Sequence, residues 1–536
     1  MSRTGPKDQI APGHLPATRL GRLSYAAVLV LLVWSIVHWG SHGASESHDE
    51  WDVESLQWPV VMTQVAPVAD NGTGARLNGR TFPAAWGDGA RLLLVEPDGT
   101  VKRLAETFHS ACDPEVSFDG KRVLFAGRPT ADDSWGIYEM VLDRSTIRQV
   151  VKTDRTCRNP RYLSSLYTID SDMPWYQILF VGSPNASSSQ HGGSELYSCR
   201  LDGSELTRLT NTVSTTADPV LMPDGRVLFA SWQPTDPMTI DQGRVGLFAV
   251  NLDGTDYATA AGIQGRRVQH MPCLTAGGQL ICVEADDVAA DGSGMLGSVS
   301  MRRPLHSYRP VTGSGKGLFH SPSPLPDGSI LVSWRSGAWG ATHAVYRFDL
   351  KTQAMTQIHD DPRYDEIQAQ VVRPRKEPDG RSSVVRSSDP YGEFYCLDAY
   401  TSDREFAPGS LKRVRVMEGV ASERHGAGRP DDLPRVTRRT LGEVPVESDG
   451  SFRMKVPANT PIQLQLLDAQ GTTVRSCRWI WVRNREPRGC IGCHEDGERT
   501  PENRFVEAMT KPSVLLQQRD GDVNEIPSSR PEAPNP

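Results

Sequence analysis

The sequence has little cysteine, no sustained basic run and no more than one long hydrophobic run. What is scarce excludes whole classes of protein. Nine cysteines scattered over 536 residues are too few for a disulfide framework. Lysine and arginine total 58 against 65 aspartates and glutamates, and the net charge of −7 argues against a nucleic-acid surface. Glycine and proline are plentiful, at 48 and 39 residues, so frequent turns are expected in place of long helical bundles.

The single hydrophobic run spans residues 23–39 inside a window, 23–45, that has no charged side chain. At about 1.5 Å per residue a helix of this run is roughly 26 Å long, close to the hydrocarbon core of a bilayer. Arg3, Lys7, Arg19 and Arg22 precede it and favour a cytoplasmic leader, 1–22. We therefore expect a single-pass anchor at 23–45 in the inner, cytoplasmic membrane, with the bulk of the chain in the periplasm. A cleaved signal peptide and a buried core helix are the alternatives.

A short sequence pattern recurs along the middle of the chain. Asp113-Pro114 leads through Asp119-Gly120 into an apolar run, and Asp218-Pro219 leads through Asp224-Gly225 into another. Related copies contain Met271-Pro272, Ser323-Pro324 and, more weakly, Asp379-Gly380, with Asn159-Pro160 in the position of a missing copy. The spacing is close to 50 residues.

A period near 50 built from short apolar runs and Asp-Gly turns predicts the four-stranded blades of a β-propeller. These repeats resemble those of TolB-like, WD40-like propellers. We expect about six blades over residues 81–404, preceded by a linker, 46–80. The hairpin that begins at Arg91 has only the second half of a unit and the stretch from Ile367 mainly the first half, so the two ends are expected to share one blade, which removes exposed sheet edges.

The period ends near residue 405, and alternating runs then predict a small antiparallel β-domain, 405–485, of sandwich type. The fold class is therefore mainly β: a propeller, a small β-domain and one amino-terminal transmembrane helix. The last parts are a haem-motif segment, 486–512, and a disordered tail, 513–536.

The candidate cofactor-binding motif is Cys490-Ile491-Gly492-Cys493-His494. Two cysteines at this spacing followed by histidine form the attachment sequence for c-type haem, in which two thiols bond the porphyrin vinyl groups and the histidine ligates the iron. We expect one covalent haem c held by Cys490, Cys493 and His494. A zinc site completed by Cys477, Glu495 or His425 is one alternative, and a CxxC redox pair is the other.

Only 42 residues follow His494, so we expect the small β-domain to pack the haem, with Trp479 or Trp481 and a short helix, 501–510. Met509 is one candidate for the second iron ligand, His425, the nearest earlier histidine, is another, and an open sixth position is the third possibility. Arg483, Arg485 and Arg488 are candidate partners of the haem propionates, with simple solvation as the alternative.

Four segments resemble the middle, haem-bearing domain of the hydrazine synthase alpha subunit family: residues 441–452, 456–461, 466–471 and 490–495. The resemblance implies the order propeller, β-domain, haem, and a haem that acts on a small nitrogen or oxygen species. The family continues into a second c-haem domain, and its working haem is associated with a tyrosine four residues beyond the motif histidine, where this sequence has Glu498. On these two departures we expect one haem and chiefly electron transfer.

Three functions remain open: a membrane-anchored electron carrier whose propeller docks a redox protein, a haem enzyme, and a TolB-like interaction protein with a structural or sensory haem. No catalytic residue is assigned. Residues 313–317 lack the pattern of a phosphate loop, and His494-Glu495 lacks the second histidine of a zinc protease. His270, His306, His320 and His343 are expected to be ordinary strand histidines, with a lining of the central funnel as the alternative.

Overall fold

The computed structural model describes residues 56–67, 87–168, 171, 173–184, 193–236, 239–262, 264–286, 291–421, 436–493, 498 and 502–517. These parts are mainly β, as predicted, with one turn of 3-10 helix, η1 (Glu507–Thr510). No helix in the described ranges is long and apolar enough to span a bilayer. The anchor expected at 23–45, His425 and His494 all lie outside them.

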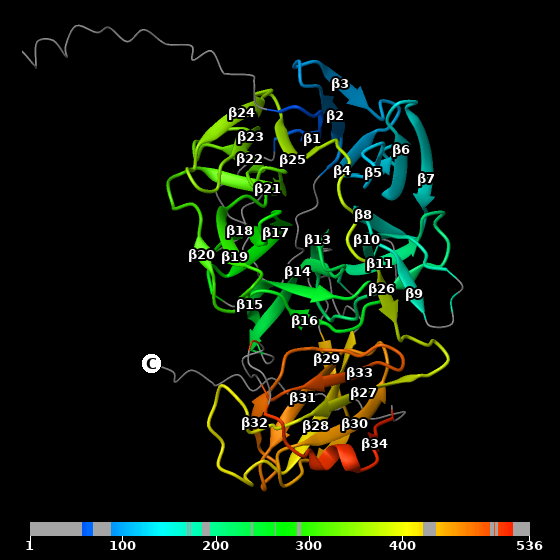
Figure 1. The fold of residues 1–536 in the computed structure, drawn as a ribbon, viewed down its shortest axis with the longest axis vertical. Helices are drawn as coiled ribbons and strands as arrows, with labels where there is room; N and C mark the ends of the chain where they lie inside the picture. The colour runs from blue at the N-terminus through cyan, green and yellow to red at the C-terminus, as the bar shows by residue number, and fades with distance from the viewer. Residues whose placement is uncertain are drawn as a thin grey trace, which may run out of the picture. The chain divides into compact units, whose positions relative to one another are not determined.

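Six blades form the propeller, each made of four strands (Figure 1). The blades, innermost strand first, are β25 (Asp365–Val371), β1 (Val60–Val65), β2 (Arg91–Val95) and β3 (Val101–Leu104); β4 (Ser110–Val116), β5 (Arg122–Arg128), β6 (Gly136–Val141) and β7 (Thr146–Val151); β8 (Arg155–Tyr162), β10 (Gln177–Pro184), β11 (Glu195–Arg200) and β12 (Thr207–Arg208); β13 (Thr216–Leu221), β14 (Val227–Asp236), β15 (Thr239–Val250) and β16 (Ala258–Thr259); β17 (Val268–Leu274), β18 (Gln279–Ala285), β19 (Met295–Ser300) and β20 (Arg309–Pro310); and β21 (Leu318–Pro324), β22 (Ile330–Arg335), β23 (Ala344–Phe348) and β24 (Met355–His359).

The ring closes as predicted, because one blade contains strands from both ends of the propeller. β25 pairs antiparallel with β1, and the innermost strands contact one another in sequence from β4 round to β25 and back to β4. The linker prediction for 46–80 was wrong at β1. All six residues of β1 are buried, so the strand has none of the apolar–polar alternation that marks a half-exposed strand.

Each innermost strand carries a β-bulge at the same place, and the bulge residue has a left-handed backbone. The six bulge residues, with φ between 39° and 59°, are Asp113, Asn159, Asp218, Met271, Ser321 and Gln368. The side chains of five of them, all but Asn159, accept hydrogen bonds that link the blades.

The links join neighbours around the ring: the bulge residue of one blade accepts a hydrogen bond from the backbone N–H of the next. Asn159 donates to Asp113 Oδ2 over 3.0 Å, Gln368 donates to Ser321 Oγ over 2.8 Å, and Asp113 donates to Gln368 Oε1 over 3.0 Å. Met271 donates to Asp218 Oδ2 over 3.1 Å. In five blades the bulge residue is followed by proline. In the copy that contains β21 this pair is Ser321-Pro322, not the predicted Ser323-Pro324.

Asp119-Gly120, Asp224-Gly225 and Asp327-Gly328 form the turn between the first two strands in three blades, and Gly120 shows why glycine is needed. Its φ is +71°, and a Cβ there would lie 2.6 Å from the backbone carbon of Arg373. Asp379-Gly380, the weakest predicted copy, is not such a turn: it precedes β26 (Arg381–Ser383), which pairs parallel with β9 (Leu166–Thr168) outside the blades.

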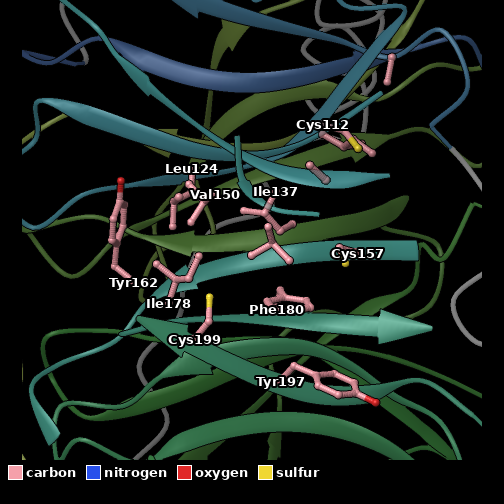
Figure 2. Close-up of a cluster of buried hydrophobic side chains, with 14 of the residues drawn as sticks. Cys112, Leu124, Ile137, Val150, Cys157, Tyr162, Ile178, Phe180, Tyr197 and Cys199 are labelled. Carbon is pink, nitrogen blue, oxygen red and sulfur yellow. The ribbon is translucent and has the colours of Figure 1, made fainter. Parts of the chain in front are cut away.

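Apolar side chains from successive blades pack together to form the core between them. Figure 2 shows one such cluster, in which Leu124 and Ile137 of one blade face Ile178 and Phe180 of the next. Cys112, Cys157 and Cys199 lie in the same cluster as buried free thiols, as do Cys273 and Cys282 elsewhere in the propeller. Burial raises the pKa of the Cys157 thiol to about 11, so these sulfurs behave as small apolar groups.

The small domain is a sandwich of two four-stranded sheets around one core. It is not wholly antiparallel, because two edge strands pair parallel with their neighbours. It also begins earlier than residue 405, since β27 belongs to it. In order across each sheet, the strands are β33 (Pro487–Cys490), β27 (Tyr391–Cys396), β30 (Phe452–Pro457) and β34 (Val514–Leu515), and β29 (Val436–Pro445), β28 (Arg413–Ala421), β31 (Ile462–Leu467) and β32 (Thr473–Ser476).

The small domain contacts the propeller through Trp481. Its ring stacks on Tyr257 with 4.1 Å between ring centroids, and its Nε1–H donates to Gly254 O over 3.3 Å. Glu486 Oε1 accepts the backbone N–H of Asp256 over 2.7 Å. This docking contact fixes the chain just before the cysteine motif.

Candidate functional site

The two motif cysteines lie at one edge of the sandwich. Cys490 ends β33, an edge strand that runs parallel to β27, and its carbonyl accepts the N–H of Leu397 over 2.9 Å. The chain continues beside the turn after β27, where the N–H of Cys493 donates to Thr401 O over 2.9 Å. The sequence between the cysteines is therefore held by backbone bonds along its length.

Gly492 explains one of the two spacer residues. A Cβ at this position would lie 2.0 Å from Thr401 O, so any larger residue would push the motif away from the sandwich. The close approach allows the hydrogen bond of Cys493 and keeps both thiols at the same edge.

The thiols of Cys490 and Cys493 are half-buried and pack against the apolar core of the small domain. Cys396 and the five propeller cysteines are buried instead. A partly exposed pair of thiols beside an apolar surface suits a large planar group that must be reached from outside and bonded at two points. The described residues thus fit a covalently attached porphyrin in position and in chemistry.

The zinc alternative has less support in the described part of the chain. Cys477 is engaged, since its sulfur accepts the N–H of Leu464 over 3.0 Å and lies 3.0 Å from Arg478 O. Burial raises the pKa of this thiol to about 12. Within the described ranges no three histidine, cysteine or acidic side chains are grouped to hold a metal ion, and Glu495 lies outside those ranges.

The neighbouring arginines and tryptophans are placed differently from expectation. Arg483 Nη1 donates to Arg208 O over 2.8 Å, and Arg488 donates to the carbonyls of Tyr257 and Trp481. These two arginines therefore bind backbone at the domain junction, and Trp481 faces the propeller. Arg485 is exposed.

The segment after the motif returns to the sandwich. Arg504 donates to Leu397 O over 2.7 Å, and the N–H of Ala508 donates to Ser451 Oγ over 3.0 Å. The helix expected at 501–510 is reduced to the single turn η1. Met509 lies in η1 with 41% of its surface exposed, and Phe505 is 76% exposed. The role of Met509 as an iron ligand stays a prediction.

Of the histidines singled out in the propeller sequence, His270, His320 and His343 are buried near the bulges and have polar partners. His320 Nδ1 lies 2.6 Å from Ser321 Oγ, and His343 Nδ1 lies 3.1 Å from Asp365 Oδ1. Burial, together with the nearby His343, lowers the pKa of His320 to about 3, so its ring is neutral. His306 is on an exposed turn. The acidic partners come from distant strands, which is why the sequence did not reveal them.

The fold and the site define a class: a six-bladed propeller joined to a small β-sandwich that carries a CxxCH motif at its edge. Residues 409–495 match the family of the hydrazine synthase alpha subunit middle domain. The hydrazine synthase subunit alpha of Kuenenia stuttgartiensis is 27% identical over 518 residues, covering 77% of this chain and 64% of that relative. The predicted resemblance to the hydrazine synthase alpha-like family is confirmed.

One solved structure agrees on the fold. The structure of Kuenenia stuttgartiensis hydrazine synthase superposes with a TM-score of 0.73 at 23% identity, covering 85% of this chain and 72% of that chain. TolB from Acinetobacter baumannii gives a TM-score of 0.37 at 14% identity, over 58% of this chain and 66% of TolB. This chain thus spans a little under two thirds of its curated relative.

Proposed function

We propose that the chain is a c-type haem enzyme, similar to the hydrazine synthase alpha subunit, that acts on a small nitrogen species. The observation that carries the proposal is the pair of half-buried thiols, Cys490 and Cys493, at the edge of the domain that matches this family. In this proposal His494 would supply an imidazole ligand to the iron. The expected electron carrier becomes the second candidate, since the similarity favours the enzyme.

The residues have distinct tasks in this proposal. Cys490 and Cys493 would form thioether bonds to one porphyrin, and the backbone hydrogen bonds that they make with Leu397 and Thr401 hold this part of the chain in place. The bound haem supplies an iron that takes up a small ligand and exchanges electrons with it. The apolar core that packs against the thiols would offer the bound ring an apolar contact surface.

We also propose that the protein is exported and tethered by residues 23–45, with a redox protein as its partner. Covalent haem attachment outside the bacterial cytoplasm agrees with the basic residues before that segment. A reporter fused after Pro536 is expected to be active in the periplasm only. Activity in the cytoplasm would contradict export.

Covalent haem is tested by producing the protein with the haem-maturation machinery. The wild type should keep its colour after acid-acetone extraction and stain for haem in denaturing gels. Cys490→Ala and Cys493→Ala should weaken the linkage, whereas Cys477→Ala, which changes a thiol outside the motif, should not. A colourless protein with stoichiometric zinc would refute the proposal.

Iron coordination separates enzyme from carrier, because a catalyst needs an open position and a carrier gains from two strong ligands. We expect the reduced wild type to bind carbon monoxide and nitric oxide at once. A low-spin spectrum that carbon monoxide leaves unchanged in the wild type but shifts in Met509→Ala would identify Met509 as the ligand and favour the carrier.

A further inference from the structure

We propose that Glu498 is a positioning residue: its carboxylate docks the chain that follows the cysteine motif onto a turn of the propeller and thereby fixes the surroundings of His494. The inference rests on the proposed haem. It assigns to the propeller a direct part in shaping the haem site.

Both carboxylate oxygens of Glu498 have partners on one propeller turn. Oε1 accepts the backbone N–H of Leu305 over 2.7 Å, and Oε2 accepts Nε–H of Arg303 over 3.0 Å. The Glu498 side chain is 16% exposed, whereas that of Arg303 is 68% exposed. The backbone bond is therefore the better shielded of the two, and the arginine adds a charge-assisted bond at the rim.

The carboxylate is ionised at neutral pH. Burial alone would raise its pKa, but the hydrogen bonds from Leu305 and Arg303 outweigh burial and lower it. An ionised carboxylate is a stronger acceptor for both donors than a neutral acid or an amide.

The turn that receives Glu498 is itself firmly held. It lies between β19 and β20, where the N–H of Arg303 donates to Ser300 O over 3.0 Å. Gly262, in the loop after β16 of the preceding blade, donates to Pro304 O over 3.0 Å, and a Cβ on Gly262 would lie 2.6 Å from Leu305 O. Two blades thus brace this turn, which makes it a fixed platform.

The other anchor is on the small domain, where the N–H of Cys493 donates to Thr401 O. Only four residues separate Cys493 from Glu498, and His494 is the first of them. Cys493 and Glu498 thus attach the two ends of this connection to different domains. Loss of the Glu498 contacts would leave the Cys493 end with its contact to the sandwich alone.

The test uses the full-length, haem-loaded protein with Glu498→Ala, Glu498→Gln and Arg303→Met. The matched control is Glu502→Gln, an exposed glutamate of the same segment. Hydrogen–deuterium exchange of peptides covering 494–501 should speed up about tenfold in Glu498→Ala, the factor expected for one lost bond to a charged group. Glu498→Gln, which keeps an acceptor for Leu305, and Arg303→Met should show smaller increases, and the control none.

The second measurement is the rate at which carbon monoxide binds to the reduced haem. If Glu498 positions the haem surroundings, this rate should change severalfold in Glu498→Ala and stay unchanged in Glu502→Gln. Unchanged exchange would overturn the docking, and faster exchange with an unchanged rate would show a merely structural contact. A wild type without haem would instead overturn the proposed function, while the exchange data still decide whether Glu498 docks.

Discussion

Removing the Trp481 side chain should loosen the small domain from the propeller. Trp481 is 1% exposed, stacks on Tyr257 and donates its indole N–H to Gly254 O. Truncating a buried tryptophan costs about 3–5 kcal/mol through lost apolar contact and the cavity left behind. We expect Trp481→Ala to lower the free energy of unfolding of the small domain by about this amount.

The assay is urea unfolding of the full chain, followed by circular dichroism and by proteolysis of the 372–390 connection. Trp339→Ala is the matched control, because Trp339 is 90% exposed and its loss should cost within about 0.5 kcal/mol. Trp481→Phe keeps an aromatic ring but loses the N–H donor. Its loss of unfolding free energy should lie between those of Trp339→Ala and Trp481→Ala, at about 1–2 kcal/mol. A loss below about 1 kcal/mol in Trp481→Ala would refute the view that this contact holds the domain.

Two further predictions concern the propeller. Asp113→Ala should destabilise the propeller by about 3–5 kcal/mol in thermal or urea unfolding, because Arg158, 2.6 Å from the wholly buried Asp113 carboxylate, would lose its counter-charge. The control is Asp98→Ala, at an exposed position, and an equal effect of the two substitutions would contradict the prediction. The hydrogen bond to Glu366 raises the pKa of His359 above 6.5, so the pair contributes stability that is present below about pH 6.5 and lost as pH rises through the raised pKa. The melting temperature of His359→Gln should therefore fall less than that of the wild type over this range, and parallel pH profiles would refute it.

The sequence was sufficient for the blades because four of the six innermost strands, β4, β13, β17 and β21, have the same six-residue spacing from bulge residue to turn. Asp113 precedes Asp119 as Asp218 precedes Asp224, and the bulge and the turn both restrict the backbone strongly enough to leave a mark on residue choice. β1 left no such mark. It is buried on both faces and pairs with β25 about 300 residues away, so neither its period nor its neighbours identified it.

The site was predictable to the extent that its chemistry is local. Cys490 and Cys493 are identified by their spacing, and Gly492 fits between them because of a close approach that only the fold reveals. The partners of Glu498 are nearly 200 residues distant in sequence, on a turn with no motif of its own. Contacts of that kind leave no periodic signal.

The arginines show how proximity in sequence can mislead. Arg483, Arg485 and Arg488 all precede the cysteine motif, yet two of them donate to backbone carbonyls at the propeller junction. Carbonyl oxygens in a buried junction need donors, and the guanidinium groups of Arg483 and Arg488 supply them there. Of the three, Arg485 has the exposed side chain, so we expect a propionate of the proposed haem to pair with Arg485 if with any of them, whereas the other two serve the junction that holds the motif in place.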